Sequence, residues 1–421
     1  MPNILKPGSP FLVDSVTGGI TGIKNADGSE ALFAAVGGEQ IARAAARYPA
    51  KHRPGSSFLN VAGDSWANGN GASVGSRAFA NRLATRYGSA FRVSNYGYSG
   101  RPISGYQQAP RVSGTNQSNA ALIQTALGDV TFGIFGLNDL NGIDVNAGNT
   151  GCGPRPENFP NLMTRVQAVA SWFMVPESSR VRMHTLNNSG QNPAVTFSGT
   201  WNHGGFQNNP NFSFGSGANG EFVQLTTTPG DLLIIRHATV NGTGTMRVTV
   251  DGVDVLDRSI QSQYESFFTI DSTILKLPAG GAHTVRLTAV GATLLMVDSV
   301  DCVDTSTDFS ATLLYSPPTY LTTAGWAATA NSPNSSTVAT ATGASVWLYD
   351  NGGCDRFGAA IREAMDGLFL MGFNVAELPI RQGWNPNFMT SGGDPLHPND
   401  QGHAHIFDRA AFGVDRLLLG R

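Results

Sequence analysis

A serine that follows a buried apolar run and a histidine near the C-terminus are the side chains best suited to do chemistry together. Ser65 lies in Gly-Asp-Ser-Trp directly after SFLNVAG, and His397 lies in DPLHPND before the last helical pattern. A histidine takes the proton of a serine hydroxyl as a general base and returns it to a leaving group. Asp394, in the same turn as His397, is suited to hold the imidazole in one tautomer. These residue types predict nucleophilic acyl transfer.

Two further motifs offer hydrogen-bond donors for a developing oxyanion. NYGYSG ends in Gly100, where the missing Cβ allows the backbone N–H to approach a ligand closely, and Gly97 competes for this role. Asn138, in GLND after the apolar run VTFGIF, has a side-chain amide at a predicted strand end. Each motif alone is weak, since glycine, aspartate, serine and asparagine are ordinary turn residues.

Taken in order, the four blocks around Ser65, Gly100, Asn138 and His397 resemble the SGNH (GDSL-type) hydrolase family. The resemblance covers residues 56–140 and 394–421. It implies that Ser65 is the nucleophile, with Asp394 and His397 as its base pair. It also implies an oxyanion hole of the Ser65 and Gly100 N–H groups and the Asn138 amide, and an acyl-enzyme route without metal or organic cofactor. Trp66 departs from the family, because many members have an aliphatic residue there.

Other polar and aromatic residues have competing interpretations. His403 and His405 could be proposed as metal ligands with Asp394, but side chains two apart on a helix point away from each other, so we expect no metal site. Asp64 is adjacent to the nucleophile and is expected to be structural. Trp66 and Trp201 are candidate substrate-binding residues. In TWNHGGF, which also contains His203 and Phe206, the alternative is a set of buried sandwich aromatics.

Alternating strand and helix patterns must position these residues. SFLNVAG, FRVSNYG and DVTFGIFGLND read as buried strands, and SRAFANRLATRYG, NAALIQTALG and NLMTRVQAVASWFM as helices. After residue 304, ATLLYSPPTYL, CDRFGAAIREAMDGLFLMG and NDQGHAHIFDRAAFGVDRLLLG return to the same texture. Such alternation predicts a parallel α/β sheet. The family resemblance implies its three-layer, flavodoxin-like form, built from residues 56–190 and 305–421.

Residues 191–304 have a different texture, without a convincing helix. We expect strands at VTFSGTW, FVQLTTT, DLLIIRHATV, TMRVTVDG, STILKL, HTVRLTAV and LLMVDSVDCV, with Gly, Asn and Pro turns between them. This pattern predicts an inserted antiparallel β-sandwich of the jelly-roll kind, similar in texture to carbohydrate-binding modules. Among the cysteines Cys152, Cys302 and Cys354, a bridge between Cys152 and Cys354 and three free thiols are both open.

Residues 1–55 form an N-terminal extension that resembles segments of bacteriophage tail-associated proteins. LVDSVTGGITGIKNADGSEALF predicts strands separated by Gly-Gly and Asp-Gly turns, GGEQIARAAARY a helix, and KHRPGSS a linker. The first residues lack the apolar core of a secretory signal, and no stretch approaches the roughly 18 apolar residues of a membrane span. We therefore expect a virion or extracellular protein without a signal peptide or membrane partner.

Net charge bounds the class of partner. A formal charge of −3, with scattered Lys and Arg, gives no electrostatic footprint for nucleic acid. The leading hypothesis is a tail-associated O-acetylesterase that acts on an acetylated bacterial surface polysaccharide, with other phage tail proteins as partners. A trimer would suit a tail component, although no heptads support it. The alternatives are a general small-ester or lipid esterase and a non-catalytic glycan-binding adhesin.

Overall fold

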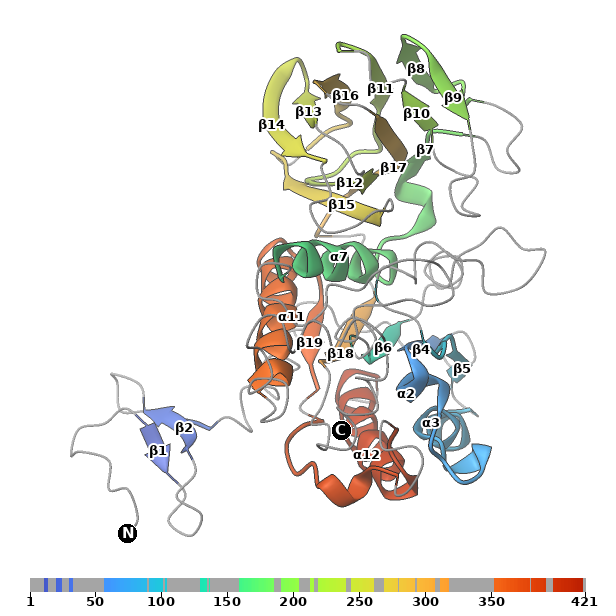
Figure 1. Ribbon diagram of the computed structural model, residues 1–421, viewed down its shortest axis with the longest axis vertical. Helices are drawn as coiled ribbons and strands as arrows, with labels where there is room; N and C mark the ends of the chain where they lie inside the picture. Colours follow the sequence, from blue (N-terminus) through green and yellow to red (C-terminus); the bar gives the residue numbers. More distant parts are fainter. Residues whose placement is uncertain are drawn as a thin grey trace, which may run out of the picture.

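The structure is a computed structural model of the 421-residue chain (Figure 1). It describes residues 57–88, 91–100, 103, 129–134, 136, 159–184, 191–203, 213–215, 219–239, 244–260, 269–278, 280–291, 294–306, 311–317, 352–378, 380–390 and 397–418, together with three short strands before residue 33. The helices expected at 37–48 and 119–128, residue Cys152 and hence the Cys152–Cys354 bridge, and site residues Asn138 and Asp394 lie outside the described residues.

The N-terminal strands form a small antiparallel sheet. β1 (Phe11–Val13), β2 (Ile20–Lys24) and β3 (Glu30–Leu32) pair in the order β1-β2-β3. The connections between them contain the Gly-Gly and Asp-Gly pairs, which favour the left-handed backbone of tight hairpins. The strands predicted for this segment are therefore confirmed.

A five-stranded parallel sheet carries the blocks singled out in the sequence. Its strands are β4 (Ser57–Gly63), β5 (Phe91–Asn95), β6 (Val130–Ile134), β18 (Thr312–Ser316) and β19 (Val375–Glu377). The order is β19-β18-β6-β4-β5, and every neighbouring pair is parallel. In chain order this is 2-1-3-4-5, the flavodoxin-like order, which reverses between β4 and β6. The predicted parallel α/β sheet is confirmed.

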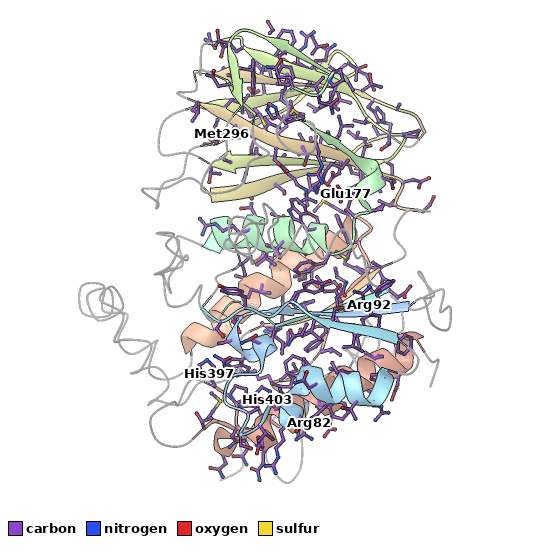
Figure 2. All side chains as sticks on the ribbon, turned by 90° about the vertical axis from the view of Figure 1, so that its right-hand side faces the viewer. Arg82, Arg92, Glu177, Met296, His397 and His403 are labelled. Atoms are coloured by element: carbon purple, nitrogen blue, oxygen red, sulfur yellow. The ribbon has the colours of Figure 1, made fainter. Side chains whose placement is uncertain are left out.

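Helices cover both faces of this sheet (Figures 1 and 2). The α-helices are α2 (Ser65–Asn68), α3 (Phe79–Tyr87), α7 (Phe159–Trp172), α11 (Gly352–Leu370) and α12 (Asp400–Leu418), and the 3-10 turns are η1 (Gly75–Arg77), η3 (Glu177–Ser179) and η4 (Pro386–Phe388). α3 and α12 pack together on one face, and α7 and α11 lie together on the other. β6 is buried along its whole length, as a central strand covered on both faces should be.

An antiparallel β-sandwich follows α7. One sheet has the order β15-β12-β17-β10-β9 with β7 on β17, and the other has the order β14-β13-β16-β11-β8. The strands are β7 (Arg180–Arg182), β8 (Val195–Ser198), β9 (Trp201–His203), β10 (Ser213–Gly215), β11 (Phe222–Thr226), β12 (Leu232–Thr239), β13 (Thr245–Val250), β14 (Val253–Ser259), β15 (Thr269–Lys276), β16 (Thr284–Val290) and β17 (Leu295–Val303). The antiparallel sandwich expected for this part of the chain is confirmed.

Three details of the sandwich differ from the sequence prediction. The single strand expected at 195–201 is two strands in different sheets, because the chain turns at Gly199 with φ +91°. β7 pairs with β17, so strands of the sandwich begin before residue 191. Two strands were not predicted: β10 has only three residues, and β14 is an edge strand whose Val253 and Val255 are 64% and 46% exposed and whose pattern lacks a buried face.

The sandwich and the parallel sheet share one hydrophobic core. Leu232 and Ile234 of β12 and Val303 of β17 belong to the same buried cluster as Val169 of α7 and Phe132 of β6. These strands are buried on both faces because one face points into the sandwich and the other onto α7. Figure 1 shows α7 lying between the sandwich and the rest of the molecule.

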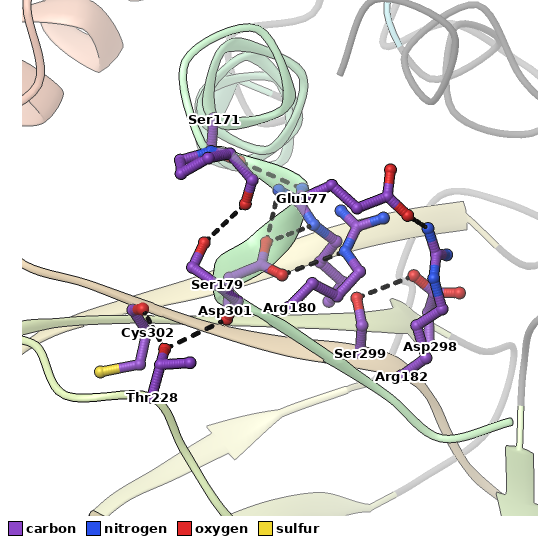
Figure 3. Close-up of polar contacts among 12 residues, drawn as sticks. Ser171, Glu177, Ser179, Arg180, Arg182, Thr228, Asp298, Ser299, Asp301 and Cys302 are labelled. Atoms are coloured by element: carbon purple, nitrogen blue, oxygen red, sulfur yellow. Dashed lines mark hydrogen bonds and ion pairs between the residues drawn. The ribbon is translucent and has the colours of Figure 1, made fainter. Parts of the chain in front are cut away.

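A buried ionic cluster also joins the sandwich to α7 (Figure 3). Asp301 of β17 accepts hydrogen bonds from Arg180 Nε at 3.0 Å and from Arg236 Nε at 3.1 Å, and all three side chains are at most 1% exposed. Arg236 also donates to Ser171 Oγ of α7 at 3.1 Å. Both guanidinium groups lie over the Trp172 ring, 3.9 and 4.0 Å from its centre. Burial lowers the pKa of Arg236 to about 10, although Asp301 opposes that shift.

Candidate functional site

The nucleophile candidate Ser65 lies at the point where the strand order of the parallel sheet reverses. β4 ends at Gly63, where φ is +146° and a Cβ would lie 1.7 Å from the carbonyl oxygen of Ile134 in β6. The Asp64 N–H donates to the same oxygen at 3.1 Å. Only glycine fits this approach, which brings the carboxyl ends of β4 and β6 together directly before Ser65. Open parallel sheets bind ligands in the crevice at such a reversal.

Ser65 is the first residue of the short helix α2. Asp64, only 1% exposed, caps this helix, and its Oδ1 accepts the Trp66 N–H at 3.0 Å, which confirms its expected structural role. The N–H of a first helical residue has no acceptor within its own helix, so the Ser65 N–H is suited to a ligand. α2 ends at Gly69 in the left-handed region, and the Gly69 N–H donates to the Ser65 carbonyl at 3.1 Å.

The loop after β5 separates the roles of Gly97 and Gly100. The Gly97 N–H donates to Asn95 Oδ1 at 2.8 Å, and a Cβ on Gly97 would lie 2.3 Å from the Asn68 nitrogen. Gly97 is therefore a packing position against α2. Gly100 has φ +75°, and a Cβ there would meet no atom within 4 Å. The role of Gly100 as an oxyanion donor stays a prediction.

The histidine candidate His397 lies against the loop that follows α2. A Cβ on Gly71 would lie 2.8 Å from His397 Cβ and 2.3 Å from the Pro398 carbonyl oxygen. The Asn70 N–H, directly before Gly71, donates to the Ser65 carbonyl at 3.0 Å. The partly buried His397 thus packs beside the turn that carries Ser65, called here the nucleophile turn, and Figure 2 shows its side chain close to α2.

Polar contacts clamp the start of α12 to the same loop. Asp400 accepts hydrogen bonds from the Ser73 N–H at 2.9 Å, from Ser73 Oγ at 2.7 Å and from Arg77 Nη1 at 2.5 Å. The Ser73 hydrogen bonds and Arg77 hold the pKa of Asp400 at about 2. Three residues further along α12, the fully buried His403 donates from Nε2 to the Asn70 carbonyl at 3.0 Å. The start of α12, directly after His397, is therefore fixed to the loop that follows α2.

His403 and His405 have separate partners. His403 accepts the Phe79 N–H at its Nδ1, and burial lowers its pKa, so the ring is neutral. His405 Nε2 donates to the Ile380 carbonyl at 2.7 Å, and its ring contacts Trp384 and Phe388. In the described part of the chain, no three His, Cys, Asp or Glu side chains gather as metal ligands would. The HxH spacing reflects two structural contacts of α12.

The two candidate substrate-binding tryptophans are buried. Trp66, 3% exposed, stacks on Trp384 with ring centres 5.3 Å apart and planes 17° apart. Trp201, 8% exposed, donates from Nε1 to the Ser198 carbonyl at 2.9 Å and contacts the Phe197 ring. Neither ring has a free face of the size that stacking on a sugar requires. For Trp201, the alternative of a buried sandwich aromatic is the one that the structure supports.

Ser65 lies just after β4, Gly100 lies in the loop after β5, and His397 packs on Gly71 in the loop after α2. The catalytic roles of these three residues, like those of Asn138 and Asp394, stay predictions. Sequence reasoning missed Trp384, Gly71 and Asp400. They come close to this site only because the fold brings together segments that are distant in sequence. Only Asp400 had a signal, as an acidic residue in the first turn of a predicted helix.

Comparisons with known proteins give no family. No family model matches the sequence, and no curated protein matches it. Among solved structures, a two-domain esterase active on acetylated mannans, co-crystallised with mannopentaose, is similar at 10% identity over 63% of this chain and 94% of that chain, with a TM-score of 0.31. A family 35 carbohydrate binding module from an environmental isolate has 16% identity over 25% of this chain and 82% of its own, with a TM-score of 0.21. The catalytic domain of a GH87 alpha-1,3-glucanase in complex with nigerose has 17% identity over 30% of this chain and 28% of its own, with a TM-score of 0.24. Separately, no helix in the described part is long and apolar enough to span a membrane.

Proposed function

We propose that this chain is a serine ester hydrolase of the SGNH type, with Ser65 as nucleophile and His397 as general base. The observation that carries the proposal is the packing of the His397 segment on Gly71, beside the turn that presents Ser65 at the strand-order reversal. A serine at such a turn and a histidine from a C-terminal loop are the two groups that acyl transfer needs. Asp394 completes the proposed base system.

The proposed reaction has two steps. His397 takes the Ser65 proton as the hydroxyl oxygen attacks an ester carbonyl, and the N–H groups of Ser65 and Gly100 with the Asn138 amide hold the oxyanion. Each donor of this kind contributes about 3 kcal/mol in the transition state. His397 then protonates the departing alcohol, and water activated by the same imidazole releases the acid. The chain supplies every group in this scheme.

We extend the proposal to acetyl esters on a bacterial surface polysaccharide. The support is architectural: the sandwich shares its core with the parallel-sheet part, so a polymer bound by the sandwich would be held on the same packed unit as Ser65. Association with a phage tail, and a trimeric state with it, stay predictions from the N-terminal segment.

Acetate release from acetylated bacterial polysaccharides tests the proposal. Ser65→Ala should lower kcat by roughly 10⁶-fold, as loss of a serine nucleophile does elsewhere. Ser306→Ala is the matched control, because Ser306 is an exposed serine that bonds only Asp304 among the groups of its turn. Equal acetate release by Ser65→Ala and Ser306→Ala would contradict the proposed hydrolase.

Chain-length preference on aryl esters tests the substrate class. Preference for acetyl over octanoyl esters supports the acetylesterase, because a deacetylase needs only a small acyl pocket. Preference for octanoyl or longer esters would leave the hydrolase intact and replace its substrate by a lipid. Glycan affinity without turnover of any ester would instead identify an adhesin.

A further inference from the structure

An aromatic stack joins the nucleophile turn to a segment distant in sequence. Trp66 directly follows Ser65, and its ring stacks on Trp384 at 5.3 Å. Trp384 follows β19, and its other ring contacts are nearly perpendicular ones with Phe388 at 5.5 Å and His405 at 5.6 Å. The Trp384 ring is thus held by three aromatic neighbours. Its Nε1 is buried and has no hydrogen-bond acceptor in the described part, so the ring acts by packing.

The segment that contains Trp384 is bonded to His397 and to the two residues that follow it. The Thr390 N–H donates to the His397 carbonyl at 2.9 Å, and Met389 forms an antiparallel bridge with Pro398. Asn399 Nδ2 donates to the carbonyls of Asn387 and Met389 at 2.6 and 2.9 Å. Residues 384–390, which include the 3-10 turn η4, therefore form a backing segment for the chain around His397.

These contacts form a continuous path from the nucleophile to the base. We propose that Trp384 is a positioning residue, whose stack on Trp66 sets the place of residues 384–390 and, through Thr390, that of His397 relative to Ser65. This inference rests on the proposed function. The stack fixes one end of the backing segment to the residue next to the proposed nucleophile, while hydrogen bonds fix the other end to the backbone of the proposed base.

The path explains why a tryptophan at position 66 suits this chain. An aliphatic side chain at that position would leave the face of Trp384 without its stacking partner, and aromatic pairs contribute beyond the area that they bury. A shift of the backing segment by about 1 Å would displace His397 by a similar amount, which costs up to about 10²-fold in rate when reacting groups are misaligned.

Steady-state kinetics on a small aryl acetate test the positioning role. Trp384→Ala should lower kcat by about 10- to 100-fold with KM nearly unchanged, because the small substrate does not touch the stack. Trp384→Phe keeps an aromatic face and should recover most of kcat, because no hydrogen bond from Nε1 is lost. Unchanged kcat in Trp384→Ala, or no recovery in Trp384→Phe, would overturn the inference.

A double-mutant comparison separates positioning from a general structural effect. If Trp384 acts through His397, Trp384→Ala should cause no further loss of residual turnover in a His397→Ala background. An equal loss in both backgrounds would mean that Trp384 only supports the fold. If Trp384→Ala does not fold by circular dichroism, Trp384→Leu replaces it with the same expected outcomes. Full turnover by Ser65→Ala would contradict the proposed hydrolase itself. Loss of turnover in Ser65→Ala together with an unchanged kcat in Trp384→Ala would contradict the positioning role alone.

Discussion

Gly71→Ala is the substitution that most directly tests whether the packing beside Ser65 sets the reactivity of His397. At Gly71, φ is +89°, and an added Cβ would lie 2.3 Å from the Pro398 oxygen and 2.8 Å from His397 Cβ. Ordinary van der Waals contacts begin at 3.4 Å, so the segments that carry Gly71 and His397 must separate by about 1 Å. The atoms in the way are backbone and Cβ atoms, which cannot rotate aside. The histidine segment must therefore move.

Two separate costs follow from that geometry. The left-handed backbone costs an L-residue about 1–2 kcal/mol, which corresponds to a Tm lower by roughly 2–8 °C in a domain of this size. The displacement of His397 by about 1 Å should lower kcat/KM on an aryl acetate by roughly 10²-fold. Gly71→Ala should therefore fold, melt slightly earlier and lose most of its activity.

Gly220→Ala is the matched control for Gly71→Ala. Gly220 has φ +93°, and a Cβ there would meet no atom within 4 Å, so this variant carries the backbone strain without the collision. Its Tm should fall by a similar amount, while kcat/KM stays at the wild-type value. Equal kcat/KM for the two variants would refute the reasoning, since contact between Gly71 and the His397 segment would then have no bearing on turnover.

Two further predictions concern buried charges. Burial alone would raise the pKa of Asp301, but Arg180 and Arg236 hold it below its ordinary value. Asp301→Asn removes the carboxylate that both buried guanidinium groups bond, so it should lower the free energy of unfolding in urea by about 3–5 kcal/mol. The exposed Asp257→Asn, which also loses an arginine partner, should change the unfolding midpoint little, and equal effects would contradict the burial argument. Burial lowers the pKa of His403 below 6.5, so below that pH the unfolded chain binds a proton that the folded chain does not, and stability falls. His403→Gln should reduce the drop in Tm between about pH 7.5 and about pH 5.5. An unchanged dependence of Tm on pH would contradict this prediction.

The sequence predicted the parallel sheet because local patterns determine its parts. The run VTFGI becomes the buried strand β6. The helix α3 ends before Gly88 as expected, although Gly88 is in the right-handed region. Chain order then limits how such units can pair. The sandwich strands with a buried face, such as β13, were predicted for the same reason.

The missed features depend on contacts between distant segments. Asp400 and Ser73 are 327 residues apart, and nothing near either residue indicates the pair. The same holds for Trp66 and Trp384, whose stack exists only after β4 and β19 have joined one sheet. Gly71 looks like any other glycine of a polar loop, and its need for a missing Cβ appears only when Pro398 is in place. Local patterns carry no record of such pairings.

The position of Leu232, Ile234 and Val303 bears on attempts to trim the molecule. These residues lie in the core of the parallel-sheet part although their strands belong to the sandwich. Excision of residues 191–304 would uncover an apolar side of α7 and leave Ser171 without its guanidinium partner. A shortened protein made in this way should aggregate or melt at a lower temperature, and its loss of turnover would say nothing about glycan recognition. The inserted strands are thus part of the packing that supports the parallel-sheet part rather than a separable domain.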